Sequence, residues 1–393
     1  MAKCLVTFDN NPSGIYSTGQ TLSGRVELTI PKVKTVKVVT LNIVGYAKCR
    51  WEETELRSHG YHGRTYKGRV DYISFSMNLV EPEKGEKTVD MPPGTHYYTF
   101  TYDLPHEIPT SFEGSTGYIR YYVIIDLETP LSWNFDQKFK TAFTVLKQFD
   151  LNIDANLLSL PSQGTVDQNL SFGPFKNGPV TIIANTAQTG YVPGQTIIVH
   201  ADIQNASTAK INEIRFSFQQ IIRYISIKPK IKTRMKVITV AEARVGYLDQ
   251  NQQNRTFDQY LQIPSLPPSC TSLCKIITIT YEVRVEAKVS GFYRNPEVKI
   301  PITLGTIPLT NNVFSTVPNS NLSQSTVNPT GAPRVQGNMP PPSYEECIFG
   351  AAQVRDDEDD ENTVISCTNC TPRYPVYNCS EWPNGRTENQ PSQ

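Results

Sequence analysis

Side chains that could perform acid–base or nucleophilic chemistry are scattered through this sequence without a catalytic pattern. None of the five histidines stands beside a nucleophile pattern. The motifs G-x-S-x-G and H-E-x-x-H are absent, and Gly85-Glu86-Lys87-Thr88 lacks the glycine spacing with which a P-loop cradles phosphate. We therefore predict that the protein is not an enzyme and needs no cofactor.

The cysteines offer one candidate metal-binding pattern, near the C-terminus. Cys367, Cys370 and Cys379 would supply three thiolates, whereas a structural zinc site takes four ligands. The last histidine, His200, is far away in the sequence. We predict reduced thiols and no metal site there, with reversible acylation near a membrane as an alternative. The chain is also long enough to fold without a disulfide framework.

A pair of prolines followed by a tyrosine indicates recognition instead of catalysis. Adjacent prolines fix φ at roughly −65° and lack N–H groups, so Pro341 and Pro342 favour an extended polyproline II ribbon. Tyr344 can place its ring in a pocket of an aromatic-lined groove. The segment Thr371-Pro372-Arg373-Tyr374 lacks the first proline, which makes Pro372 and Tyr374 a weaker second candidate.

Two groups of basic residues are candidate surfaces for binding anions. The first group lies in a stretch that we predict to be a long exposed hairpin loop, and it consists of His59, His62, Arg64, Lys67 and Arg69. The second group consists of Lys228, Lys230, Lys232, Arg234 and Lys236. Either could attract an anionic lipid surface or an acidic or phosphorylated cargo tail, and either could be a solvated strand edge.

Charge is balanced over the whole chain but not along it. The 37 Lys and Arg residues equal the 37 Asp and Glu residues, so the basic footprint of a nucleic-acid-binding protein is missing. Residues 306–393 hold four arginines and ten acidic residues, a net charge of −6, which leaves +6 on the preceding part. The acidic run from Asp356 to Glu361 could fold back onto the basic surfaces and compete with cargo, or it could be a solvated spacer.

Hydrophobic alternation dominates the first 305 residues and predicts an all-β fold. Segments such as 26–30, 39–43, 73–77 and 283–287 carry an apolar residue at every second position, as half-buried antiparallel strands do. Turn-forming pairs such as Pro93-Gly94 and Pro267-Pro268 recur between the strands. No convincing apolar stripe at helical spacing occurs, so we predict antiparallel β-sandwiches.

An internal repeat sets the number of domains. Residues 16–21, Tyr-Ser-Thr-Gly-Gln-Thr, return as residues 191–196, Tyr-Val-Pro-Gly-Gln-Thr. The same offset of 175 aligns apolar positions of the next strand, namely Val36, Val39, Leu41 and Ile43 with Ile211, Ile214, Phe216 and Phe218. We predict sandwiches at residues 1–147 and 178–305, a polar connector at 148–177 and a disordered tail at 306–393.

These features together resemble the α-arrestins, also called arrestin domain-containing proteins. The resemblance rests on the paired Tyr-x-x-Gly-Gln turns, on the tail motif Pro341-Pro342-Ser343-Tyr344, and on segments 8–16, 45–51 and 108–121. It extends over almost the whole chain. It implies two immunoglobulin-like arrestin sandwiches and an adaptor in place of a catalyst.

Members of this family engage membrane receptors or transporters with the arrestin module and recruit HECT-type ubiquitin ligases through WW domains that bind PPxY motifs. The resemblance implies that Pro341, Pro342 and Tyr344 bind WW domains, so that cargo is ubiquitinated and endocytosed. The protein would be cytoplasmic and recruited peripherally to the plasma membrane and endosomes. Two alternatives are a thioredoxin-binding redox regulator, which needs an accessible thiolate-prone cysteine, and a retromer-like sorting subunit, which would not need the tail motif.

Overall fold

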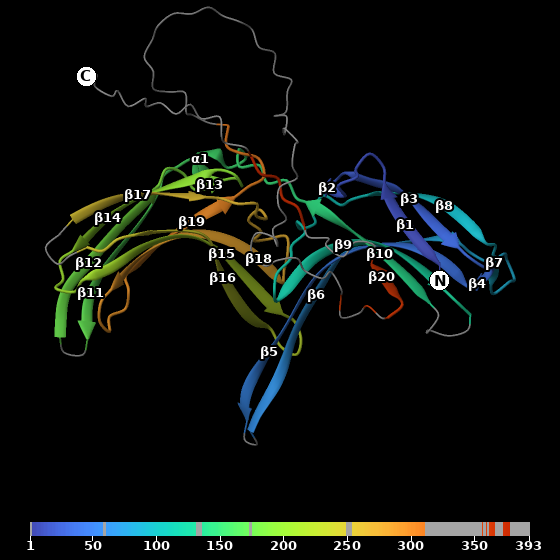
Figure 1. The fold of residues 1–393 in the computed structure, drawn as a ribbon, viewed down its shortest axis with the longest axis horizontal. Coiled ribbons are helices and arrows are strands. Elements are labelled where there is room, and N and C mark those ends of the chain that lie inside the picture. Colours follow the sequence, from blue (N-terminus) through green and yellow to red (C-terminus); the bar gives the residue numbers. More distant parts are fainter. Residues whose placement is uncertain are drawn as a thin grey trace, which may run out of the picture.

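A computed structural model of the chain describes residues 2–57, 60–130, 136–172, 175–248 and 254–310, and residues 356, 359, 361–365 and 372–377 of the tail. Within these ranges the chain is almost entirely β-structure. It forms two β-sandwich domains that lie side by side (Figure 1). The predicted all-β fold with tandem sandwiches is confirmed.

The first domain packs two sheets against each other. One sheet has the order β1-β3-β8, with bounds Lys3–Phe8, Thr21–Ile30 and Gly94–Asp103. The other has the order β2-β10-β9-β5-β6, with bounds Ile15–Ser17, Gln137–Leu146, Gly117–Glu128, Val38–Arg57 and Gly60–Val80. The short strands β4 (Lys34–Val36) and β7 (Val89–Met91) pair with each other.

The second domain repeats this plan. One sheet has the order β11-β12-β14-β17, with bounds Ser162–Phe172, Phe175–Thr186, Thr196–Asn205 and Asn254–Gln262. The other has the order β13-β19-β18-β15-β16, with bounds Gly190–Tyr191, Glu297–Leu304, Ile277–Val289, Ile211–Ser226 and Lys232–Val245. A short helix, α1 (Ala155–Leu158), lies between the domains in sequence.

The repeat in the sequence corresponds to a repeated turn. In the first domain the Gln20 Oε1 atom accepts a hydrogen bond from the Ser17 backbone N–H at 2.7 Å, and in the second the Gln195 Oε1 atom accepts one from the Val192 N–H at 2.9 Å. The aligned apolar positions are all fully buried: Val36, Val39, Leu41, Ile43, Ile211, Ile214, Phe216 and Phe218. The duplication therefore preserves both the turn chemistry and the core face.

The range 148–177 is less of a connector than its composition suggests. Strand β11 occupies residues 162–172 and pairs with β12 at the edge of a second-domain sheet. An edge strand exposes alternate side chains to solvent, so a polar sequence is compatible with it.

Strands β5 and β6 form a long hairpin that projects from the body of the molecule (Figure 1). The predicted exposed loop is instead largely strand, because the pairing continues from Val39 and Val80 to Arg57 and Gly60. The hairpin also contacts the second domain: the Lys67 N–H donates to the Lys228 carbonyl at 2.8 Å, and the Ile227 N–H donates to the Lys67 carbonyl at 2.8 Å. The hairpin therefore links the two sandwiches.

Two described pieces of the tail also pack on the domains. Strand β20 (Thr363–Ile365) pairs in parallel with residues 138–140 of β10, and residues 372–377 lie against both domains. No helix in the described part of the chain has the length and apolar character needed to cross a lipid bilayer.

Candidate functional site

The outer face of the β10-β9-β5 sheet is both aromatic and basic. Residues at alternate positions of these strands face away from the domain core, and five of them define what we call the aromatic–basic face: Tyr46, Lys48, Tyr118, Tyr122 and Lys140. Pairing places Lys48 opposite Tyr118 on the neighbouring strand. Tyr46 and Tyr122 form a small buried apolar cluster separate from the main core.

A carboxylate from the tail occupies this face. Tyr46 and Tyr118 each donate a hydroxyl hydrogen bond to the Asp356 carboxylate, and the Lys48 Nζ donates to its Oδ1 atom at 3.1 Å. The Asp356 side chain is only 1% exposed. Burial alone would raise the pKa of Asp356, but the three donors outweigh it and hold this pKa at about 2.

A second carboxylate follows one turn later. The Asp359 N–H donates to the Asp356 carbonyl at 3.0 Å, and the Asp356 N–H donates to the Asp359 Oδ2 atom at 2.8 Å. The Asp359 side chain forms a buried ion pair with Lys140, whose ammonium lies 5.2 Å from the centre of the Tyr122 ring. Strand β20 then continues along β10, so the acidic turn and a short strand dock together.

We expect Asp356→Asn to weaken this docking by about 2 kcal/mol, the equivalent of the depressed pKa. Because the docked carboxyl has a lower pKa than a free one, its contribution is present above about pH 4 and is lost as the pH falls toward 2. Hydrogen exchange of residues 361–365, corrected for intrinsic rates at each pH, measures the effect. Equal protection in the variant and the unmodified protein at pH 7 would contradict it.

A buried ion pair between Arg120 and Glu113 lies next to the tyrosines that bind Asp356. The Arg120 Nε and Nη2 atoms donate to the two Glu113 carboxylate oxygens at 2.5 and 2.8 Å. Burial by itself would lower the pKa of Arg120, but these bonds raise it and keep the guanidinium charged. The guanidinium lies 3.7 Å from the centre of the Tyr118 ring, so the pair fixes the position of one of the donors to Asp356.

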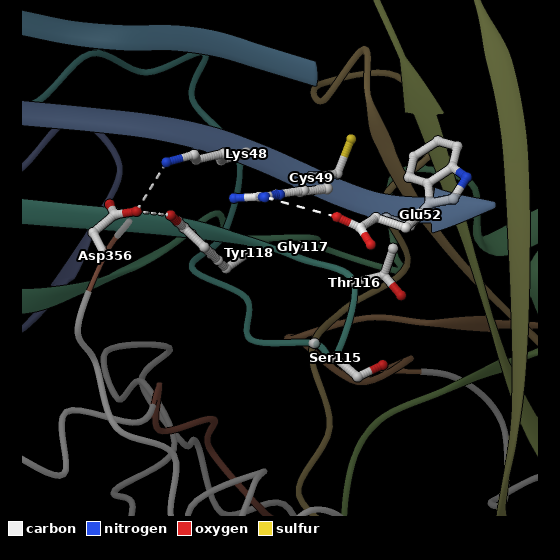
Figure 2. Close-up of a pocket in the computed structure, with 11 residues that line it drawn as sticks. Lys48, Cys49, Glu52, Ser115, Thr116, Gly117, Tyr118 and Asp356 are labelled. Atoms are coloured by element: carbon white, nitrogen blue, oxygen red, sulfur yellow. Dashed lines mark hydrogen bonds and ion pairs between the residues drawn. The ribbon is translucent and has the colours of Figure 1, made fainter. Parts of the chain in front are cut away.

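A hollow of about 390 Å³ opens beside Asp356. Lys48, Tyr118 and Asp356 lie at one end of it, and Ser115 and Thr116 line the other side (Figure 2). From the second domain, the Lys236 Nζ donates to the Ser115 Oγ atom at 2.5 Å. The hollow is therefore bordered by the first domain and the tail, and one of its walls is held by the second domain.

Comparison with known proteins identifies the tandem domains. The model of the N-terminal domain of arrestin, or S-antigen, matches residues 4–152, and that of the C-terminal domain of arrestin matches residues 176–309. The chain belongs to the arrestin family.

Individual relatives place it among the α-arrestins. It is 26% identical to arrestin domain-containing protein 17 of Caenorhabditis elegans, over 94% of this chain and 97% of the relative. It is 28% identical to human arrestin domain-containing protein 4, over 87% of this chain and 80% of the relative. It is also 28% identical to human arrestin domain-containing protein 1, over 86% of this chain and 71% of the relative. The protein is an α-arrestin and an arrestin-like adaptor.

The first predicted basic group is only partly assembled in this α-arrestin. His59 and the His62 side chain lie outside the described residues. Arg64, Lys67 and Arg69 lie on strand β6. The Arg69 guanidinium lies 4.4 Å from the centre of the Tyr46 ring, so this residue borders the aromatic–basic face.

The second basic group divides between two roles. Lys232 forms an ion pair with Glu53 of the β5–β6 hairpin, and Lys236 contacts Ser115, so both join the domains. Lys228, Lys230 and Arg234 are exposed. Large apolar side chains of the same segment are also exposed, namely Ile227, Ile231, Met235 and Val237, but alternation along β16 places Met235 and Val237 on the face opposite Arg234. The segment 227–231 of the α-arrestin therefore exposes both basic and apolar side chains.

Of the two predicted tail motifs, the structure describes only the second. Pro341, Pro342 and Tyr344 lie outside the described residues, so their role stays a prediction. Tyr374 is 1% exposed; its hydroxyl donates to the Ser111 carbonyl at 2.8 Å, and its own carbonyl accepts from the Ser265 Oγ atom at 3.1 Å. Pro372 is also buried. Contrary to the expectation of a freely presented second motif, a WW domain cannot reach this ring while the segment is docked.

The described cysteines of the α-arrestin do not have the character of reactive thiols. Burial raises the pKa of Cys4 to about 12 and that of Cys49 to about 11, and it also raises the pKa of Cys270 and Cys274. Cys274 is packed in the core. Cys367, Cys370 and Cys379 lie outside the described residues, and within the rest no cluster of His, Cys, Asp or Glu is arranged to hold a metal ion.

The sequence predicted, as one alternative, that the acidic run folds back onto the domains, but it did not predict the surface that the run contacts. The contacts fall on the aromatic–basic face, not on the two basic groups. A signal was present: Tyr46-x-Lys48 and Tyr118-x-Arg120-x-Tyr122 place aromatic and basic residues at the non-core positions of two strands. Without the strand register, nothing in the sequence brings these two patterns together.

Proposed function

We propose that this α-arrestin links a membrane receptor or transporter to a HECT-type ubiquitin ligase. The ligase binds Pro341-Pro342-Ser343-Tyr344 through a WW domain, and the two arrestin domains hold the cargo. The observation that carries this proposal is the presence, in one chain, of both arrestin domains and a proline–tyrosine motif beyond them. Ubiquitination would then direct the cargo into endocytosis, with the adaptor recruited from the cytoplasm to the plasma membrane and endosomes.

The exposed basic and apolar side chains of residues 227–231 support the membrane side of the proposal. Lys228 and Lys230 favour an anionic lipid surface or an acidic cargo segment. Ile231, with 79% of its area exposed, and Ile227, with 48%, can then contact apolar groups of the partner. Both features suit a protein that works next to a membrane.

The motif assignment predicts a large effect of one substitution. Tyr344→Ala should weaken binding to a WW-domain ligase by roughly 10-fold or more, because it removes the ring that fills the pocket. Ser343→Ala is the matched control, since the serine acts only as a spacer, and should bind normally. A pulldown with purified WW domains measures this. Unchanged binding by Tyr344→Ala would remove the ligase part of the proposal.

A further inference from the structure

We propose that strand β8 pairs with β8 of a second copy of this chain, antiparallel about a two-fold axis, so that two first domains share one continuous sheet. Strand β8 (Gly94–Asp103) pairs with β3 on one side, and in the described part of the chain no strand pairs with its other side. It lies at the end of the first domain that points away from the second domain (Figure 1). The inference does not depend on recruitment of a ligase.

The outer edge of β8 offers a long row of backbone donors and acceptors. The N–H and C=O groups of an edge strand that point away from its neighbour have only water as a partner in the monomer. Residues 94–103 of β8 pair with residues 21–30 of β3 without any register shift. The edge is therefore long and regular, and a further strand can add to it along its whole length.

The other long edge strands carry features that discourage such pairing. Natural sheets protect an edge with charged side chains, with proline or with a bulge. Strand β1 begins with Lys3, β17 contains Arg255 and Asp258, and β16 has charged residues along its length. Strands β6 and β11 contain register shifts. Strand β8 lacks all of these devices, because residues 94–102 include no lysine, arginine, aspartate, glutamate or proline.

The duplicated domain shows which charge β8 lacks. In the second domain β17 takes the place of β8, because it pairs with β14, the counterpart of β3. The repeat aligns Arg25 of β3 with His200 of β14, and the residues opposite them are Thr99 on β8 and Asp258 on β17. Two β17 edges meeting about a two-fold axis would bring their Asp258 carboxylates together, whereas two β8 edges bring neutral threonines together.

A second copy of the chain fits this edge without unfavourable charge contacts. In an antiparallel pair about a two-fold axis, each residue of the segment 95–101 faces another residue of the same segment. That segment consists of threonine, tyrosine, phenylalanine and one histidine. Aromatic and threonine side chains are favoured in strands, and pairs of them across two strands stabilise a sheet. Pairing ends at two copies, because each chain contributes its single β8.

The inward side chains of β8 hold its backbone in place before a second copy arrives. Phe100 is buried in the core, and the centre of the Tyr102 ring lies 5.0 Å from that of the Phe75 ring in the facing sheet. A strand that is already formed and anchored loses little entropy when it pairs. On the outer face Tyr97 is 59% exposed, so its ring is available to pack against a threonine of the second copy.

Sedimentation velocity of the full-length chain over a range of concentrations tests the pairing. One pair of edge strands buries less surface than the ~1,200–2,000 Å² of a stable complex, so we expect a dissociation constant on the order of 10 μM. At about 100 μM most of the protein should then sediment with twice the 44.1 kDa mass of one chain. Hydrogen exchange of residues 94–103 should become slower as the concentration rises.

Thr99→Asp gives β8 the charge that β17 carries at the equivalent position. The new carboxylate lies opposite Arg25, so the monomer should tolerate it, but two such carboxylates repel each other and should weaken the dimer by ~10-fold or more. Thr7→Asp is the matched control, because Thr7 is exposed opposite Arg25 on β1, the other edge of the same sheet, and this variant should dimerise normally. An equimolar mixture of Thr99→Asp and Thr99→Lys should recover the dimer, since opposite charges then meet.

Three results would overturn the inference. The first is a chain that remains monomeric at about 100 μM. The second is a dimer that survives Thr99→Asp, that Thr7→Asp weakens equally, or that the mixture of opposite charges does not restore. The third is protection of residues 94–103 at every concentration in a monomer, because another segment of the chain would then cover β8.

Circular dichroism of each variant confirms that a loss of the dimer is not a loss of folding. The sedimentation and exchange measurements contain no ligase, and the variants leave Tyr344 unchanged. Failure of the proposed function would therefore be seen separately from failure of the dimer.

Discussion

Replacing Arg120 by alanine is expected to lower the free energy of unfolding of the first domain by about 3–5 kcal/mol. The side chains of Glu113 and Arg120 are only 4% and 9% exposed, so the variant leaves a buried carboxylate without its partner. That loss is a large fraction of the ~5–15 kcal/mol that stabilises a typical domain. Urea denaturation, followed together with calorimetry to separate the two domains, measures it.

Two controls define the origin of this loss. Arg50→Ala should cost less than about 0.5 kcal/mol, because Arg50 and Glu52 are 45% and 69% exposed and 3.9 Å apart. The double variant Glu113→Gln/Arg120→Met removes both charges and should recover much of the stability. If Arg120→Ala were no more destabilising than Arg50→Ala, the buried pair would not have the structural role we assign to it.

Replacing Tyr374 by alanine is expected to release residues 372–377 from between the two domains. Truncating a buried aromatic side chain costs about 3–5 kcal/mol where the chain must stay in place. Residues 372–377 form a short segment that can detach from the domains instead, so the cost to the domains is limited to the free energy of docking. Tryptic cleavage after Arg373 should become roughly 10-fold faster or more, since each 1.4 kcal/mol of docking free energy changes the open population tenfold.

Gly194→Ala tests the same segment with its own sequence intact. At Gly194, which has a φ of +96°, an added Cβ would lie 2.0 Å from the Tyr377 carbonyl oxygen. Gly19→Ala is the matched control, because Gly19 occupies the equivalent turn of the first domain at a φ of +80°. Its Cβ would meet the ring of His106, an exposed side chain that can move away. Accelerated cleavage in both variants, or in neither, would contradict a specific clash with the segment.

The second tail motif contacts both domains through Tyr374. The Tyr374 hydroxyl donates a hydrogen bond to the first domain, and its carbonyl accepts one from Ser265 of the second domain. The Tyr377 hydroxyl adds a bond to the Thr306 carbonyl at 2.7 Å. In this state Tyr374 braces the two sandwiches, so ligase recruitment in the proposed function rests on Tyr344.

Much of the fold could be predicted from the sequence because it depends on local patterns. Alternation at period two defines the buried face of each strand, and in β18 the burial follows it at every residue. The repeated turn identified the duplication, since Gln20 and Gln195 make the same hydrogen bond in each domain. The two duplicated β-sandwiches follow from these patterns without any long-range information.

The placement of the tail could not be predicted in this way. Asp356 bonds to Tyr46, 310 positions away, and Tyr374 bonds to Ser111, 263 positions away. Acidic composition indicates attraction to a basic surface but not which surface, because strand register decides which side chains converge on one carboxylate.

The sequence alone thus determined two duplicated β-sandwiches, a basic body with an acidic tail, and a candidate ligase motif, because periodicity, charge and proline stiffness act over a few residues. Only the tertiary structure decided that Asp356 and Asp359 occupy the aromatic–basic face and that Tyr374 is buried between the domains. These contacts need donors from separate strands to meet in space, and that meeting is a property of the packed sheets.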